Sequence, residues 1–456
     1  MEMAYLVQKQ RAFFQKGVTK SLTFRKKSLE RLEKGIYSYE KKIHQALLAD
    51  LGKSEFESYM TEVGMTLSEL SYVKKKVSDW AKPCPVFTPL AQFPAKSFEV
   101  TEPYGVVLIM SPWNYPFMLC MEPLIGAIAA GNCCVVKPSA YAPHTSAVLK
   151  ELLSFLFPPE FVAVVEGGRE ENSLLLEQRF DYIFFTGGKA VGRLVLEKAA
   201  VHLTPVTLEL GGKSPCIVDE TADLKMAAKR LVFGKYLNSG QTCVAPDYLL
   251  VQETVKEPFL KYVKAWIHQM LGENPLDNPD YPRMINKKHY DRVLDLLQGE
   301  KIAEGGYGRE ESLQIAPTIL EKVSSDAPVM QEEIFGPVLP VLTYASIEEA
   351  EDFISSREKP LALYLFTTNK ATEQRILKNL SFGGGCINDT IIHLATPYMG
   401  FGGVGASGMG SYHGKKSFDT FSHRKSIGKK GNYLDLPVRY QPYTKVKKQF
   451  LRMFLK

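Results

Sequence analysis

A thiol and a carboxylate stand in two glycine-containing segments of one stretch of the chain. Cys243 follows Gly-Gln-Thr, and Glu209 comes shortly before the pair Gly211 and Gly212. Glycines allow a ligand to approach the backbone closely. A thiolate can add to an electrophilic carbon, and a nearby carboxylate can then activate water to release the product. The two residues therefore indicate covalent catalysis, whereas an isolated cysteine is more often a small buried hydrophobic residue.

The elements around these two residues favour a catalytic position. Residues 206–210 have the pattern of a strand that ends at the two glycines, so Glu209 lies at its carboxyl end. Open α/β sheets bind their ligands at that edge. Cys243 lies in a loop between a predicted helix, residues 224–237, and a predicted strand, residues 248–251.

Several motifs around these residues resemble those of one enzyme family. TLELGGKSP and YLNSGQTCVAP are similar to the glutamate and cysteine signatures of the aldehyde dehydrogenase superfamily, in the order and approximate separation used there. CVAPDY, PWNYPF and QEEIFGPVLP resemble its class 3 branch, which includes fatty-aldehyde and aromatic-aldehyde enzymes. The likeness extends from about Glu62 to Phe421.

The resemblance implies a reaction and a catalytic set. Aldehydes would be oxidised to carboxylic acids with NAD(P)⁺ as the oxidant. Cys243 would form a thiohemiacetal and then a thioester, and water activated by Glu209 would hydrolyse the thioester. Asn114, in Pro-Trp-Asn-Tyr-Pro, matches the residue that stabilises the oxyanion, together with the backbone N–H of Cys243.

The cofactor residues follow from the resemblance rather than from a familiar fingerprint. G-x-G-x-x-G is missing after the predicted strand 182–185, and a G-x-x-x-x-G turn opens a helix instead. A helix N-terminus offers free N–H groups to a phosphate, and in the family this turn contacts the pyrophosphate. The lysine of Lys-Pro-Ser would bind the adenosine ribose, and the glutamate of Glu-Ile-Phe would bind the nicotinamide ribose. The expected cofactor-binding residues are Lys137, Thr186, Gly187, Gly188, Gly192, Glu333 and Phe335.

The choice between NAD and NADP stays open. Many NAD-preferring relatives place a glutamate three residues after the ribose-binding lysine, where its charge would repel a 2′-phosphate, and this chain has Ala140. Use of both cofactors is consistent with that difference. Lys189 could meet a phosphate or point to solvent.

The substrate pocket is expected from similar positions in the branch. Its residues are Tyr115, Met118, Leu237, Val244, Ile391, Phe401 and His413. Bulky apolar walls suit medium-chain or long-chain aliphatic and aromatic aldehydes. We expect His413 to be packed and hydrogen-bonded, because the reaction needs no second base.

Two other functions compete with this interpretation. The first is an enzyme that transfers the acyl group to coenzyme A, although the presence of Glu209 favours hydrolysis. The second is an aldehyde dehydrogenase-like scaffold without catalysis. The joint presence of Asn114, Glu209 and Cys243 is an observation against the scaffold.

The order of the predicted elements indicates an α/β protein. Residues 4–80 have a helical pattern, and strands and helices then alternate, as in doubly wound parallel sheets. We expect a Rossmann-like cofactor domain, an α/β catalytic domain and a small β oligomerisation arm. The boundaries are 1–79 and 104–208 for the NAD(P)-binding domain, 209–399 for the catalytic domain, 80–103 and 400–430 for the arm, and 431–456 for a basic C-terminal tail.

Composition limits the other function classes. The chain has 456 residues, of which 45% are hydrophobic, and no stretch has the pattern of a signal peptide or a membrane-spanning helix. Seven cysteines without Cys-x-x-Cys spacing and eight scattered histidines predict no metal site. A reducing, cytoplasmic setting follows.

Charge is concentrated at the two ends of the chain. The net charge is +6, and residues 424–456 carry 10 basic side chains and 1 acidic one. The segment TKVKKQFLRMFLK has the spacing of a basic amphipathic helix. It is expected to pack within a homodimer or, less strongly, to contact a membrane surface. No nucleic-acid partner is expected.

Overall fold

The first of two large sheets is built around a strand made of apolar residues alone. The computed structural model describes residues 2–455, and in it β3 (Val106–Met110) is completely buried. Strands covered on both faces are normally such continuous apolar runs. The other strands of this sheet are β4 (Cys133–Lys137), β5 (Val162–Val164), β6 (Tyr182–Gly187), β7 (Val206–Leu210) and β17 (Gly408–Met409).

The order of these strands is β17-β7-β6-β3-β4-β5. All neighbouring pairs are parallel except β17 with β7. The chain therefore moves outward from β3 in both directions, which confirms the doubly wound arrangement. Ligands of such sheets bind beyond the carboxyl ends of the strands, where the order reverses, here between β3 and β6.

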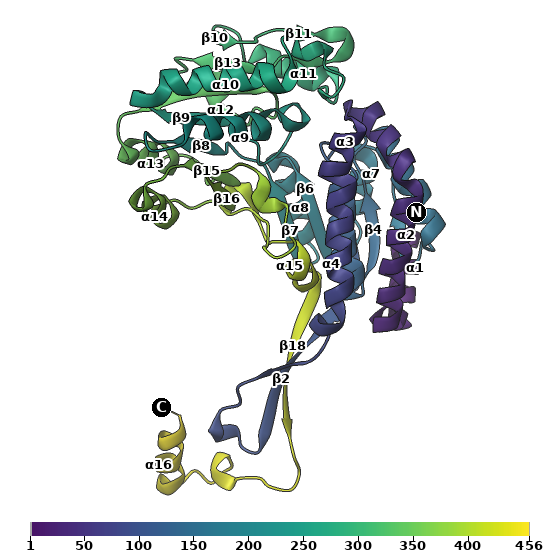
Figure 1. Ribbon diagram of the computed structural model, residues 1–456. Coiled ribbons are helices and arrows are strands. Elements are labelled where there is room, and N and C mark those ends of the chain that lie inside the picture. Colours follow the sequence, from purple (N-terminus) through teal and green to yellow (C-terminus); the bar gives the residue numbers. More distant parts are fainter. Residues whose placement is uncertain (1, 456) are drawn as a thin grey trace.

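Helices cover both faces of this sheet (Figure 1). One of them, α5 (Met118–Ala130), has every residue buried. The others are α1 (Glu2–Gln15), α2 (Leu22–Leu51), α3 (Glu55–Ser58), α4 (Gly64–Trp80), α6 (Pro143–Leu156), α7 (Arg169–Leu176), α8 (Lys189–Ala200) and α15 (Gly414–Thr420). Ser21 caps the N–H of Phe24 at the start of α2, and Gly52, with φ 71°, ends that helix.

The second sheet has seven strands in the order β10-β13-β14-β9-β8-β15-β16. Only β10 is antiparallel to its neighbour among these described strands. The strands are β8 (Pro215–Val218), β9 (Tyr248–Gln252), β10 (Lys301–Glu304), β13 (Thr318–Glu321), β14 (Val338–Tyr344), β15 (Ala362–Phe366) and β16 (Gly384–Ile387). The helices of this part are α9 (Leu224–Tyr236), α10 (Lys256–Leu271), α11 (Lys287–Asp295), α12 (Pro328–Gln331), α13 (Ile347–Ser355) and α14 (Lys370–Asn379). A short hairpin of β11 (Gly308–Arg309) and β12 (Gln314–Ile315) completes it.

A three-stranded arm projects from the body (Figure 1). Its central strand β2 (Ala95–Pro103) pairs with β1 (Cys84–Val86) and, over nine residues, with β18 (Ser422–Lys430). The chain then ends in α16 (Lys445–Phe454), beside the tip of the arm. Within residues 2–455, no helix combines the length and the apolar character that a membrane crossing requires.

The structure refines several predicted elements. The helix expected over residues 224–237 ends at Tyr236, and strands β10 to β14 were not predicted. Residues 408–409, within the range expected for the arm, extend the first sheet as β17. The glycines around them allow this close pairing, since a Cβ atom at Gly408 would lie 2.3 Å from the carbonyl oxygen of Leu208. The domain boundaries themselves stay a prediction.

Candidate active site

The loop that carries Cys243 is held in an unusual backbone conformation. After α9, Asn238 and Ser239 both have φ 51°, which is uncommon for residues with a Cβ atom. The N–H of Asn238 donates to Oε1 of Glu57 at 3.0 Å, and Oγ of Ser239 donates to the carbonyl of Pro282 at 2.5 Å. Such strain persists only where the surroundings fix it, and it concentrates at functional sites.

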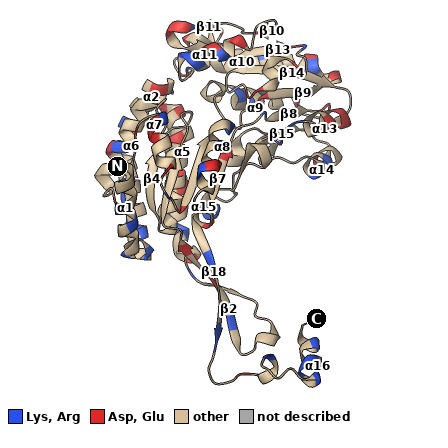
Figure 2. Cartoon of the chain, turned by 180° about the vertical axis from the view of Figure 1, so that it is seen from behind, with Lys and Arg blue, Asp and Glu red and all other residues tan. Residues whose placement is uncertain are grey.

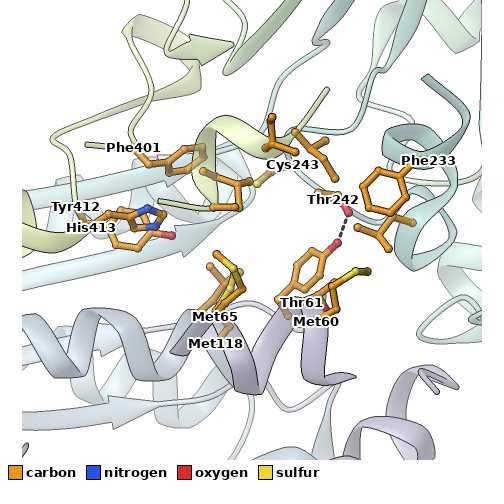
Figure 3. Close-up of a pocket in the computed structure, with 17 residues that line it drawn as sticks. Met60, Thr61, Met65, Met118, Phe233, Thr242, Cys243, Phe401, Tyr412 and His413 are labelled. Carbon is orange, nitrogen blue, oxygen red and sulfur yellow. Dashed lines mark hydrogen bonds between the residues drawn. The ribbon is translucent and has the colours of Figure 1, made fainter. Parts of the chain in front are cut away.

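Gln241 fixes the next turn of the same loop. Its Nε2 donates to the carbonyls of Asn238 and Arg283, both at 3.0 Å, and its Oε1 accepts from the N–H of Ile285 at 3.0 Å. The fully buried side chain is therefore saturated with hydrogen bonds and points away from the cavity. Thr242 and Cys243 are left to face it (Figure 3).

The Cys243 thiol lies at a cavity and has an unfavourable setting for its charged form. Burial, together with the carboxyl groups of Glu333 and Glu209, raises the pKa of Cys243 to about 12. Without a bound cofactor or substrate, the thiol is therefore protonated at neutral pH.

Glu209 occupies the carboxyl end of β7. Its backbone pairs with Thr186 on one side and Gly408 on the other, and its side chain is buried. Neither carboxyl oxygen has a hydrogen-bond partner among residues 2–455. Burial raises the pKa of Glu209 well above its ordinary value. A buried acid with two unused oxygens can bind and deprotonate a water molecule, provided that its own proton has left.

Asn114 joins the loop after β3 to the cysteine loop. Its Nδ2 donates to the carbonyl of Gln241 at 3.0 Å, which identifies the nitrogen end of the amide because two oxygens would repel each other. An amide nitrogen carries a second hydrogen, which remains available for another acceptor. The backbone carbonyl of Asn114 accepts from Nδ2 of Asn238 at 2.8 Å. The structure therefore brings Asn114 to the loop of Cys243.

The cavity beside Cys243 has a volume of about 250 Å³ and mostly apolar walls. Figure 3 shows Met60, Met65 and Met118 on one side of it, and Phe401 and His413 on another. Tyr115 Oη and Thr242 Oγ1 are 2.6 Å apart in its wall. Of the predicted pocket residues, six line the cavity: Tyr115, Met118, Leu237, Ile391, Phe401 and His413.

The seventh predicted pocket residue lies elsewhere. Val244 is fully buried behind the wall, and its carbonyl accepts from Oη of Tyr364 at 2.5 Å. The turn after Cys243 directs the side chain of Val244 away from the cavity that Thr242 and Cys243 face. Sequence reasoning missed other wall residues, which are Met60, Thr61, Met65, Leu119, Phe233, Thr242, Ile392, Leu394, Ala395 and Tyr412.

His413 is packed into the wall beside a carboxyl group. Its ring stacks on Phe401, with centroids 5.6 Å apart and planes at 18°, and its Nε2 lies 3.2 Å from Oε2 of Glu122. Burial acts to lower the pKa of His413, but Glu122 and Glu69 outweigh it and raise that pKa. The imidazole and its carboxylates therefore form a buried polar cluster behind apolar walls.

The expected pyrophosphate turn lies at the carboxyl end of β6. Thr186 Oγ1 is buried without a hydrogen-bond partner in the described chain, and a Cβ atom at Gly188 would meet no described heavy atom within 4 Å. A Cβ atom at Gly192 would lie 2.7 Å from Cδ2 of Leu210, so glycine lets α8 sit close to β7. Lys137, at the end of β4, donates to the carbonyls of Gly167 at 2.6 Å and Pro138 at 2.9 Å.

The remaining cofactor candidates are Glu333 and Phe335, with Lys189 at the start of α8. Glu333 Oε1 is also buried and unpartnered within residues 2–455, and burial raises the pKa of Glu333 to about 8. Phe335 has φ 49° and packs edge-on against Trp113, with ring centroids 5.3 Å apart. Lys189 pairs with Glu358, so its charge is used within the protein. Unsatisfied polar atoms beside an open glycine turn fit a polar ligand such as a dinucleotide.

Comparison with known proteins accounts for this arrangement. The chain matches the model of the aldehyde dehydrogenase family over residues 2–427. It is 50% identical over 448 residues to the 4,4'-diaponeurosporen-aldehyde dehydrogenase of Staphylococcus aureus, covering 98% of this chain and 97% of that protein. It is 47% identical over 420 residues to a dimeric NADP-preferring aldehyde dehydrogenase of Rattus norvegicus, covering 92% and 93%. A structure of the substrate-bound state of Staphylococcus aureus AldH superposes with a TM-score of 0.98 at 49% identity, over 99% of both chains.

These matches cover nearly the whole chain, including the N-terminal helices that precede the first motif. They confirm the resemblance seen in the sequence and extend it at both ends. The chain therefore belongs to the aldehyde dehydrogenase family, whose enzymes oxidise aldehydes with NAD or NADP.

Proposed function

We propose that this enzyme oxidises medium-chain, long-chain or aromatic aldehydes to carboxylic acids through a covalent bond to Cys243. The observation that carries the proposal is a thiol at a cavity whose walls are almost entirely apolar. Apolar walls hold an alkyl or aromatic group and offer a carboxylate-bearing substrate little compensation for lost hydration. A relative named for a 4,4'-diaponeurosporen-aldehyde supports a long apolar substrate.

The reaction begins with the addition of Cys243 to the aldehyde carbon. The thiol gives its proton to water, the sulfur–carbon bond forms and the carbonyl oxygen becomes negative. The second hydrogen on Nδ2 of Asn114 and the backbone N–H of Cys243 are the donors for this oxygen. Since Asn114 already donates to Gln241, its amide is oriented before the substrate arrives.

The cofactor would be held by Lys137, by the turn of residues 186–192, and by Glu333 with Phe335. When bound, NAD or NADP would supply the hydride acceptor for this oxidation. Ala140 is exposed and brings no carboxylate to its part of the site, which supports the use of both cofactors.

Glu209 acts in the second half of the reaction. As a carboxylate it removes a proton from water, the water oxygen bonds to the thioester carbon, and the carbon–sulfur bond breaks. The products are the carboxylic acid and the restored Cys243. The two unpartnered oxygens of Glu209 leave this residue free to bind the water.

The test is a chain-length series measured with NAD and with NADP, followed by mass analysis of the product with and without coenzyme A. We expect kcat/KM to rise with the length of the alkyl chain and the product to be the free acid in both conditions. An acyl-CoA product would mean that the acyl group is transferred to coenzyme A instead of being released by hydrolysis. Inactivity toward every aldehyde with either cofactor would favour the non-catalytic scaffold.

We further propose that the enzyme is a cytoplasmic homodimer in which the arm contacts the partner subunit. A relative is named dimeric, and the aromatic side chains of Phe87 on the arm and Tyr433 directly after it are more than 80% exposed. Lys and Arg cluster on α16, whose apolar face includes Phe450 and Phe454 (Figure 2). Light scattering measures the molar mass of the protein in solution and therefore tests whether it is a dimer. Vesicle sedimentation with and without residues 444–456 tests the membrane alternative, which equal partitioning would exclude.

A further inference from the structure

A buried ion pair lies behind the cavity, outside the reacting groups. Lys53, between α2 and α3, and Glu62, in the π-helical turn Tyr59–Val63, are both fully buried. Lys53 Nζ is 2.6 Å from Oε1 of Glu62. Burying two charges is costly, so such a pair needs further hydrogen bonds to satisfy its remaining donors and acceptors.

Those further hydrogen bonds all go to one loop. Lys53 Nζ donates to the backbone carbonyl of Asn114 at 3.0 Å. Glu62 Oε2 accepts from the N–H of Phe117 at 2.8 Å and of Met118 at 3.2 Å. The ammonium group also lies 3.9 Å from the centre of the Tyr115 ring. Together the two charges contact four of the five residues from 114 to 118.

This loop supplies both the proposed oxyanion donor and part of the cavity wall. Asn114 offers its amide to the oxyanion, and Tyr115 and Met118 line the cavity. The peptide carbonyl of Asn114 accepts from two donors, Lys53 and Asn238, which fixes the plane from which its side chain extends. Asn238 belongs to the cysteine loop, so the ion pair and that loop both hold the carbonyl of Asn114.

We infer that Lys53 and Glu62 are positioning residues that set the Asn114 amide for the oxyanion. The inference rests on the proposed role of Asn114. A charged donor and a charged acceptor form stronger hydrogen bonds to backbone groups than neutral ones do. These direct hydrogen bonds fix the position of the loop without bridging water. A misplacement of about 1 Å in a catalytic group can lower a rate about 100-fold.

The test uses a neutral pair of similar shape. In Lys53→Met/Glu62→Gln the glutamine oxygen can still accept from the loop, but the donor to Asn114 and both charges are lost. Replacing both charges avoids leaving one of them alone in the interior. The matched control is Lys74→Met/Glu33→Gln, which neutralises an ion pair on the same helical layer, away from the cavity.

We expect kcat/KM for the aldehyde to fall about 10-fold to 100-fold in the test variant and less than about twofold in the control. Cofactor affinity and the rate of Cys243 alkylation by iodoacetamide stay unchanged, because alkylation needs no oxyanion donor. In an Asn114→Ala background the same double substitution costs less than about twofold, because the group that it positions is already absent.

Two results would overturn the inference. The first is an equal fall in kcat/KM in the test and control variants. The second is a fall in kcat/KM in the Asn114→Ala background that is as large as the fall in the wild-type background. If the test variant does not fold, Lys53→Arg replaces it in the same cycle, since it keeps the charge and changes the position of the donors. An Asn114→Ala enzyme with normal kcat/KM would instead refute the proposed oxyanion role itself, which separates the two failures.

Discussion

A Cβ atom at Gly211 would lie 2.0 Å from Oε2 of Glu333, so these two residues share a space that only one of them can occupy. Glycine at 211 is therefore what allows the glutamate to stand where it does. Its carboxyl group is the flexible end of the side chain, so an added methyl group would displace the carboxyl group without unfolding the protein.

Gly211→Ala tests the role of Glu333 without changing Glu333. We expect the KM for NAD or NADP to rise about fivefold to tenfold, the usual effect of losing one hydrogen bond. Gly212→Ala is the control, since a Cβ atom there would be 3.4 Å from its nearest neighbour, at ordinary contact distance. Equal KM values in the two variants would mean that Glu333 does not bind the cofactor.

The two halves of the reaction separate in a second pair of variants. Cys243→Ala abolishes formation of reduced cofactor. Glu209→Gln gives one burst of reduced cofactor and then stalls, because the thioester forms but is not hydrolysed. Stopped-flow absorbance measures both. Cys84→Ala, at an exposed thiol of the arm, serves as the control and keeps wild-type rates. Full turnover in Glu209→Gln would exclude that residue as the base.

The pKa of Cys243 predicts how its reactivity depends on pH. In the enzyme without cofactor, a thiol with a pKa of about 12 gains thiolate tenfold for each pH unit. The rate of alkylation by iodoacetamide should therefore rise steadily with pH and show no plateau below about pH 10. Mass spectrometry of the peptide that contains Cys243 follows the reaction.

Glu333 should modify this profile in one direction. With a pKa of about 8, it is neutral below that pH and negative above it, where its charge opposes the thiolate. Glu333→Gln should therefore be alkylated faster than the wild type above pH 8 and at the same rate below. Identical profiles at all pH values would mean that the carboxyl group does not act on the thiol.

The mouth of the cavity provides a test of substrate length. Ala395 is exposed and lines the cavity, so Ala395→Trp should narrow it. We expect kcat/KM for a long-chain aldehyde to fall about tenfold and that for propanal to stay within about twofold. Ala371→Trp, on the exposed side of α14, adds the same side chain elsewhere. A similar loss for both aldehydes would show a general disturbance instead of a narrowed entrance.

Local patterns were enough to predict parallel strands of the first sheet. These strands are short apolar runs bounded by turns, such as residues 182–185 and 206–210, and the structure confirms them at nearly the same bounds. Strand β18 has no such pattern, since Ser-His-Arg-Lys-Ser-Ile-Gly-Lys-Lys neither alternates nor forms an apolar run. Its strand conformation comes from pairing with β2, a partner more than 300 residues away in the chain.

The same difference holds for the site. Cys243, Glu209 and Asn114 stand in motifs that a reader of the sequence can find. Lys53 and Glu62 look like two of many charged residues in helical segments, where exposed charges are normal. Only their burial and their contacts with the Asn114 loop distinguish them, and no spacing in the sequence encodes those contacts.

The pairing of β17 with β7 has a consequence for protein synthesis. Gly408 closes the free edge of the strand that carries Glu209, although the ribosome makes it long after that strand. Until then, a nascent chain has an incomplete edge beside Glu209, and unpaired edges invite association with other chains. Translation must therefore pass the whole second sheet before the first one is finished, so a product that stops before Gly408 would contain Cys243, Glu209 and Asn114 without the strand that closes this edge.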